Sequence, residues 1–99
     1  MDFSPLIDVG LTQGESKVYV ALLELGFAKA GRVIEQTNLQ SSVVHSVLHS
    51  LCSKGLVAYV KKENIKHYKA VSPEILLDYV EKKKQAIAMI LPVLKLKEK

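Results

Sequence analysis

The residues best suited to do chemistry lie in one stretch, from Asn38 to Val57, which reads NLQSSVVHSVLHSLCSKGLV. Its polar side chains recur at helical spacing between apolar ones, so a helix here would present hydroxyls and imidazoles to solvent. Such groups form hydrogen bonds with phosphates and base edges, and a valine among them can contact a thymine methyl group. We expect this face to comprise Ser41, Ser42, Val43, His45, Ser46 and His49. The pattern favours a surface that reads double-stranded DNA; the alternative is a solvated face on a fold used for protein contact.

Lys54, at the far end, is the only permanently charged residue of this stretch, and more positive charge follows immediately after it. The segments LVAYVKK and IKHYKAV are β-branched and aromatic, and they flank a Glu63-Asn64 pair, which predicts a β-hairpin. Lysines on such a hairpin would hold phosphates or enter a minor groove. The cluster consists of Lys61, Lys62, Asn64, Lys66, His67 and Lys69. Because strand side chains alternate between two faces, we expect roughly two to four of them to contact DNA, and the alternative is a merely soluble hairpin.

A possible metal set overlaps the first stretch. His45, His49 and Cys52 are spaced by four and three residues, so they share one helical stripe, and imidazole with thiolate suits zinc or copper. Three ligands still need a fourth, however, and Cys52 lies at the edge of the apolar stripe, where a buried free thiol is common. We therefore expect no metal and no other cofactor.

Composition limits the class of protein. Ninety-nine residues suit one compact domain, and a hydrophobic share of 48% argues against disorder. No Ser/His/Asp arrangement and no phosphate-cradling glycine loop is present, so we do not expect an enzyme. The N-terminus MDFSPLIDVG has acids where a signal peptide has bases, no apolar run approaches the roughly 18 residues of a membrane span, and there is a single cysteine. These features favour a cytoplasmic protein with no membrane partner.

The net charge of +4 is unevenly distributed. Residues 1–53 contain three basic and five acidic side chains, a balance of −2, whereas residues 54–99 contain eleven lysines and five acids, a balance of +6. A polyanionic partner would therefore be met by the second half of the chain. Lysines that only keep the surface soluble are the alternative.

The elements that must position these residues can be read from capping and periodicity. Thr12 and Glu15 form a capping-box pattern ahead of a helix over about 13–25, and a shorter helix follows over about 29–37. After the turn Asn38-Leu39-Gln40, Ser41 or Ser42 should cap the next helix, which Gly55 ends. Two helices joined by so tight a turn, followed by a hairpin, predict a mainly α winged helix-turn-helix.

A long helix is predicted at the C-terminus. Ser72-Pro73-Glu74 reads as an N-cap, a proline at the first position and an acid in the first turn; the helix should reach at least Leu91, and Pro92 should kink or end it. Its apolar stripe, with one lysine, consists of Leu77, Val80, Lys84, Ile87, Leu91 and Leu94. We expect this stripe to form a homodimer seam, with packing onto its own domain as the alternative. The expected division is a DNA-binding domain over 1–72 and a dimerisation helix over 73–99.

Three segments resemble a known family. VGLTQGESKVYVALLELG, SKGLV and HYKAVSPEILL are similar to the winged-helix domain of archaeal TrmB-type and related MarR-like transcription regulators, over about Val9 to Leu77. The resemblance implies a DNA-binding transcription factor, commonly dimeric, with the helix after the turn in the major groove. Where the family usually has an arginine and, four residues later, a tyrosine, this chain has Ser41 and His45. Longer members carry a C-terminal sugar-sensing domain, for which 99 residues leave no room, so no small-molecule effector is evident.

These observations lead to one hypothesis and one alternative. The hypothesis is a homodimeric transcription regulator that binds double-stranded DNA, with hydroxyls and histidines reading the groove and wing lysines supplying most of the affinity. The alternative is a winged-helix module that binds proteins and has no specific DNA binding.

Overall fold

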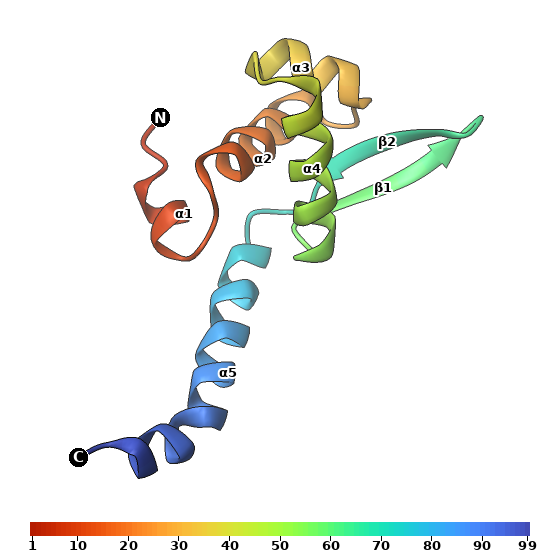
Figure 1. The fold of residues 1–99 in the computed structure, drawn as a ribbon. Helices are drawn as coiled ribbons and strands as arrows, with labels where there is room; N and C mark the ends of the chain where they lie inside the picture. Colours follow the sequence, from red (N-terminus) through yellow and green to blue (C-terminus); the bar gives the residue numbers. More distant parts are fainter.

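A computed structural model describes residues 1–99 as a mainly helical protein with one β-hairpin and a projecting C-terminal helix (Figure 1). This is the predicted fold class. The elements in chain order are α1 (Ser4–Asp8), α2 (Gln13–Leu25), α3 (Ala30–Thr37), α4 (Ser41–Ser53), β1 (Val57–Lys62), β2 (Ile65–Ala70) and α5 (Ile75–Lys97). None of the helices has the length and apolar character needed to cross a membrane.

One hydrophobic core joins α2, α3, α4 and the base of the hairpin. Leu22 of α2, Val33 of α3 and Leu48 of α4 are each fully buried in it. The helices α2 and α4 approach closely at Gly14, where an added Cβ would stand 3.4 Å from Cγ2 of Val47. This core holds α4 rigidly and turns its polar side outward.

The helix α2 begins as the capping pattern predicted. Oγ1 of Thr12 accepts from the backbone N–H of Glu15 at 3.0 Å, and the backbone N–H of Thr12 donates to Oε1 of Glu15 at 2.9 Å. The helix ends before Gly26, whose φ of 74° together with ψ of −132° is favourable only for glycine. Both predicted ends, residues 13 and 25, are confirmed.

The turn between α3 and α4 is tight, and it differs from the prediction in its cap. Asn38 adopts the left-handed conformation, with φ 59°, and Leu39 is half-buried as an anchor. The helix α4 already starts at Ser41, so Gln40 is the N-cap residue and makes no side-chain capping bond. The predicted serine cap was therefore wrong, because the three-residue turn fixes the helix start one residue earlier. The hydroxyls of Ser41 and Ser42 are consequently not used for capping.

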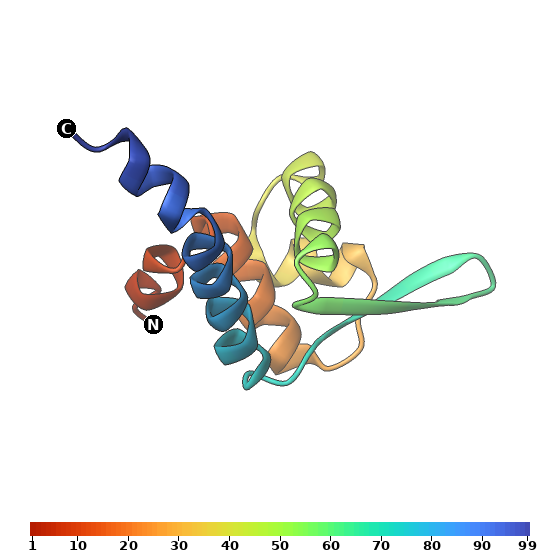
Figure 2. The same ribbon diagram turned by 90° about the horizontal axis from the view of Figure 1, so that it is seen from below.

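The hairpin extends away from the helical body (Figure 2). Its two-residue turn, Glu63-Asn64, has positive φ at both positions, 52° and 65°, as a type I′ turn requires. Ala28 pairs with Tyr68 through two backbone hydrogen bonds of 2.9 and 2.8 Å, so the outer edge of β2 is attached to the body. The strand β1 is the free edge of this sheet.

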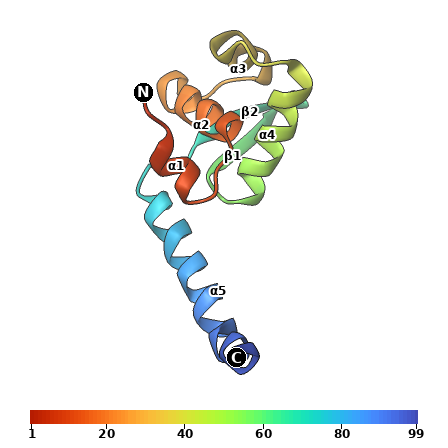
Figure 3. The same cartoon turned by 60° about the vertical axis from the view of Figure 1, so that its left-hand side comes forward.

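The helix α5 contacts the body through its N-terminal half, where Nζ of Lys83 lies 3.3 Å from the Cβ position of Gly10, and its C-terminal half projects away (Figure 3). Ile75, Leu76 and Tyr79 are half-buried against the core, and every residue from Val80 onward is exposed. The radius of gyration is 16.1 Å, whereas a compact chain of this length has about 13 Å. The projecting helix accounts for this elongation.

One prediction about α5 needs correction, its start, and of the two outcomes predicted at Pro92, a kink or an end, the structure has the kink. The helix begins at Ile75 and not at Pro73, because residues 72–77 first form a turn in which Ile75 N–H bonds the carbonyl of Ser72. Ser72 also donates through its hydroxyl to the carboxylate of Glu74. Pro92 does not end the helix, which continues to Lys97. Its axis changes direction near the C-terminus, as expected where proline removes one helical hydrogen bond (Figures 1 and 2).

Candidate nucleic-acid interface

The helix α4 exposes every residue that the sequence assigned to its contact surface. Val44, Leu48 and Leu51 face the core and are fully buried, so they fix the rotation of the helix. All six predicted contact residues are exposed: Ser41, Ser42, Val43, His45, Ser46 and His49.

The six residues do not share a single face. At 3.6 residues per turn, the side directly opposite the core contains Ser42, Ser46, His49 and Ser53. Val43 is turned toward α2, where Cγ1 lies 4.0 Å from the Cβ position of Gly14, and His45 is turned toward the hairpin. Ser53 was missed by the sequence analysis, although its spacing of four, three and four residues with the other three would have indicated it.

The one cation of α4's C-terminal end is occupied inside the protein. Nζ of Lys54 lies 2.7 and 2.8 Å from the two carboxylate oxygens of Glu15. Oγ of Ser50 donates to Oε2 of Glu15 at 2.6 Å, and the capping bond to Thr12 completes the arrangement. Burial by itself raises the pKa of Glu15, but these hydrogen bonds together lower it below its ordinary value. Lys54 therefore ties α4 to the start of α2, and the exposed face of α4 has no permanent charge.

A groove of about 550 Å³ separates α4 from the hairpin. Its walls are His45, His49, Cys52 and Ser53 of α4 with Tyr59, Lys66 and Tyr68 of the strands. Nζ of Lys66 stands 4.5 Å from the centre of the Tyr59 ring, a cation–π distance. Burial raises the pKa of the Cys52 thiol, and Lys66 partly offsets this effect. The histidines and Cys52 line the groove but do not converge into a group that could hold a metal ion.

The strand register divides the hairpin lysines between two faces. Lys61 lies opposite Lys66, two positions beyond the Tyr59–Tyr68 pair, so both lysines are on the face that looks toward α4. Lys62 and Lys69 are on the other face, together with Val60, Ile65 and the half-buried His67. The cluster seen in the sequence is thus two pairs, of which one borders the outward surface of α4.

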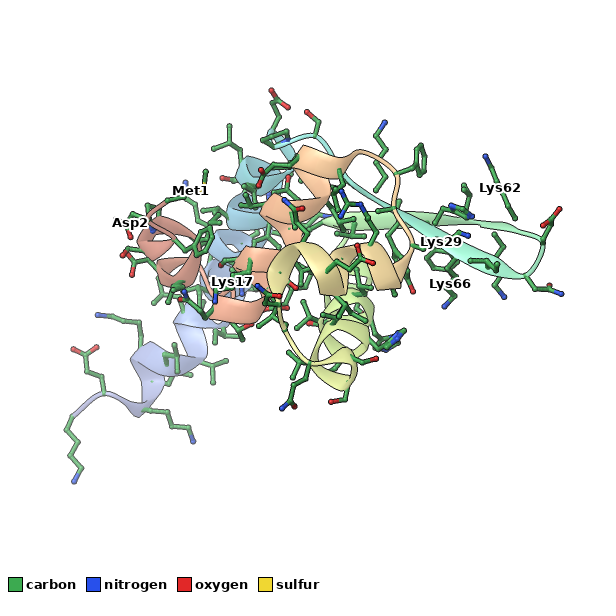
Figure 4. The ribbon with its side chains drawn as sticks, turned by 90° about the horizontal axis from the view of Figure 1, so that it is seen from above. Met1, Asp2, Lys17, Lys29, Lys62 and Lys66 are labelled. Atoms are coloured by element: carbon green, nitrogen blue, oxygen red, sulfur yellow. The ribbon has the colours of Figure 1, made fainter.

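A second groove, of about 570 Å³, lies between α3 and the tip of the hairpin. It brings Lys29 at the start of α3 together with His45, Asn64 and Lys66. Figure 4 shows Lys29, Lys62 and Lys66 at the hairpin end of the molecule, and Lys17 away from them. Lys29 was missed because it is distant in sequence from the hairpin. The Ala28–Tyr68 pairing is what places it there.

The six residues expected in a dimer seam are all exposed in the single chain: Leu77, Val80, Lys84, Ile87, Leu91 and Leu94. Leu77 is the most exposed of the five apolar ones, at 74%, and the neighbouring Leu76 packs on the body in its place. The apolar line that continues from the body therefore runs through Leu76, Val80, Ile87, Ile90 and Leu94. Compared with the predicted stripe, Leu76 takes the place of Leu77, and Ile90 takes the place of Leu91.

Comparison with known proteins agrees with the fold and the resemblance. The chain is 38% identical over 71 residues to the HTH-type sugar sensing transcriptional regulator TrmBL1 of Pyrococcus furiosus; the match covers 72% of this chain and 20% of that relative. The chain thus spans only one fifth of the length of this relative.

Solved structures show the same fold. The structure of TrmBL2, an archaeal chromatin protein, superposes with a TM-score of 0.81 at 20% identity, over 97% of this chain and 36% of that one. A possible transcriptional regulator from Methanosarcina mazei superposes with a TM-score of 0.71 at 19% identity, over 99% and 88% of the two chains.

The family assignment rests on the winged-helix part of the chain. Residues 6–74 match the family described as "Sugar-specific transcriptional regulator TrmB", which is a family of regulators and not of enzymes. The predicted resemblance is therefore confirmed. This chain, with its winged helix and projecting α5, belongs to the TrmB family of transcriptional regulators.

Proposed function

We propose that this chain binds double-stranded DNA as a homodimer and regulates transcription with a preference for certain sequences. The observation that carries the proposal is the adjacency of two surfaces: the outward side of α4, with Ser42, Ser46 and His49, and the hairpin face with Lys61 and Lys66. The first offers hydrogen-bonding groups without charge, and the second offers charge. Together they match what a duplex presents, base edges in a groove beside a row of phosphates.

The helix α4 fits the role of the reading element. A B-DNA major groove admits one α-helix, and hydroxyls and imidazoles can bond base edges there. No arginine or lysine projects from this side of α4, so the strong bidentate contact with guanine is absent. Discrimination between sequences should therefore be modest.

The hairpin is suited to bind the phosphate backbone through electrostatic contacts. Lys61 and Lys66 are directly opposite each other, and like charges in that position destabilise a sheet. A phosphate between them would relieve the repulsion and release counterions, which strengthens binding at low salt. Lys29 can add a further phosphate contact near α3, because it lines the same groove as Lys66.

The homodimer supplies the second reading surface. In this proposal residues 1–72 bind DNA, and residues 73–99 pair with the same segment of a second copy. The exposed apolar residues of α5 provide the seam, with Lys84 restricting the register. A two-fold dimer would place two α4 helices roughly one DNA turn apart. It would also double the number of hairpin lysines on one duplex.

The test is fluorescence anisotropy with a random 30-base-pair duplex, repeated from low to physiological salt. We expect binding at low salt that weakens steeply as salt rises, with a logarithmic slope of about 0.9 for each phosphate contacted. A folded protein that fails to bind at low salt would contradict the proposal. If binding is found, selection from a random-sequence pool would then give the preferred site.

A protein-binding module is a second candidate, because the far face of the hairpin has exposed apolar side chains beside Lys62 and Lys69. Phe27, Val60 and Ile65 are 56%, 46% and 44% exposed there, and β1 is a free edge to which an extended segment can add. The lysines of the opposite face discriminate between the two candidates, since replacing Lys61 and Lys66 should weaken DNA binding but leave binding of a partner to the far face unchanged.

A further inference from the structure

Glu63, at the tip of the hairpin, is a lone acid in the surface proposed to bind DNA. It is the only acidic residue between Glu35 and Glu74, a span that contains all of α4 and the whole hairpin. The same span contains five lysines. Phosphates repel a carboxylate, so an acid at this place weakens attraction to DNA in general. Its effect must therefore be sought in which DNA is bound.

The fold does not use the charge of Glu63. The side chain is exposed and takes part in none of the ion pairs of the chain, although Lys62 precedes it directly. Its φ of 52° is a left-handed conformation, which asparagine, aspartate and glycine adopt more readily than glutamate. The turn would therefore form at least as well with another residue, and the carboxylate is free to act on whatever the tip approaches.

The hairpin lysines direct this tip toward a groove of the duplex. Lys61 and Lys66 lie opposite each other, and only the Lys62–Ile65 pair separates them from the turn. In the proposed function, on which this inference rests, Lys61 and Lys66 bind phosphates, and phosphates border the grooves. The hairpin extends away from the helical body (Figure 2). With α4 in the major groove, the tip of the hairpin therefore meets the neighbouring minor groove.

The minor groove distinguishes base pairs by a single donor. A·T pairs present only acceptors there, adenine N3 and thymine O2, whereas G·C pairs add the N2 amino group of guanine. Runs of A·T pairs also narrow the groove and strengthen its negative potential, which attracts lysine. A carboxylate accepts hydrogen bonds and donates none. It is therefore repelled by an A·T groove and can accept a hydrogen bond in a G·C groove.

We propose that Glu63 makes the hairpin prefer G·C over A·T base pairs in the minor groove that its tip enters. A carboxylate oxygen of Glu63 accepts a hydrogen bond from guanine N2, and its charge opposes the attraction of the hairpin lysines to a narrow A·T groove. Such preference comes from rejecting one partner as well as from binding the other. Sequence preference then has a source on the hairpin in addition to the uncharged face of α4.

The experiment compares two pools of random 30-base-pair duplexes, one with guanine and one in which inosine replaces every guanine. Inosine keeps the major-groove atoms of guanine but lacks the N2 amino group, so the pools present the same major groove and different minor grooves. We expect wild type to bind the guanine pool roughly fivefold more tightly in anisotropy titrations at low salt. Glu63→Ala should bind the inosine pool at least as tightly as the guanine pool.

Two further variants control for the turn and for net charge. Glu63→Gly fits the left-handed turn better than glutamate does, so it should behave like Glu63→Ala with the hairpin intact. Glu24→Ala removes one exposed acid from α2 and should keep the wild-type difference between the pools. If Glu24→Ala lost the difference as well, net charge and not the hairpin tip would be responsible, and the inference would be overturned.

The outcomes separate this inference from the proposed function. Wild type that binds both pools equally, or Glu63→Ala and Glu63→Gly variants that keep the wild-type difference, would overturn the role of Glu63 and leave DNA binding in place. Folded wild type that binds neither pool at low salt would contradict the proposed function itself, and the inference with it.

Discussion

Lysine has opposite roles in two neighbouring parts of this molecule. At the end of α4, Lys54 is held by both carboxylate oxygens of Glu15 and stabilises the junction of two helices. On the hairpin, Lys61 and Lys66 have no acidic partner and repel each other across the strands. Lys54 therefore stabilises the fold, whereas Lys61 and Lys66 are available for binding. Counting lysines therefore locates a polyanion-binding site only when lysines that are paired inside the protein, such as Lys54, are left out of the count.

The largest expected effect is on stability, at the ion pair between Lys54 and Glu15. Glu15→Ala removes a helix cap and leaves Lys54 and Ser50 without their acceptor, so we expect a loss of about 3 kcal/mol in the free energy of unfolding. Urea denaturation followed by circular dichroism measures it. Glu24→Ala, in the same helix but exposed, should change the free energy by less than about 0.5 kcal/mol. Equal losses in the two variants would show that the buried pair contributes nothing special.

The next largest effect is on DNA affinity, at Lys61 and Lys66. Replacing Lys61 and Lys66 with alanine should weaken binding to any duplex by about tenfold or more and reduce the salt slope by about 1.8 per subunit. Stability should not fall, because a like-charge pair is removed. K62A/K69A, which changes the charge equally on the opposite face, is the matched control in anisotropy titrations. If both double variants weakened binding equally, charge alone and not its face would govern affinity.

Acid should break the buried pair without touching the hairpin. The folded-state pKa of Glu15 is lower than the ordinary value of 4.5, so its stabilisation is complete above that value and is lost as the pH falls below it toward the folded-state pKa. We therefore expect the unfolding free energy to drop between about pH 5 and pH 3 by more in wild type than in Glu15→Gln. Denaturation series at several pH values provide the measurement. Parallel curves for the two proteins would mean that Glu15 is not the group that titrates.

The sequence predicted the elements well, because their signals are local. The capping box at Thr12 and Glu15, the Glu63-Asn64 turn and the positive φ at Gly26 each depend on residues close in the chain. The site was predicted less completely, because its geometry depends on distant pairs. Only the contact of Ala28 with Tyr68 brings Lys29 to the hairpin, and only the β1–β2 register assigns Lys61 and Lys62 to different faces. The use of Lys54 by Glu15, 39 residues away, left no local signal either.

The smallest expected effect concerns sequence preference. Because Ser46 and Ser53 project directly away from the core, Ser46→Ala should change the ranking of duplexes by about 1 kcal/mol at one base pair while altering average affinity by less than about threefold. Val43→Ala is the comparison, since Val43 is turned toward α2 and should change the ranking less. Binding selection from a random-sequence pool, run in parallel on the three proteins, gives the rankings. The opposite result would be a Ser46→Ala variant that keeps the wild-type ranking of duplexes and a Val43→Ala variant that changes it. DNA would then approach α4 from the α2 side. In that case the groove shared with the lysine face of the hairpin could not be the binding surface.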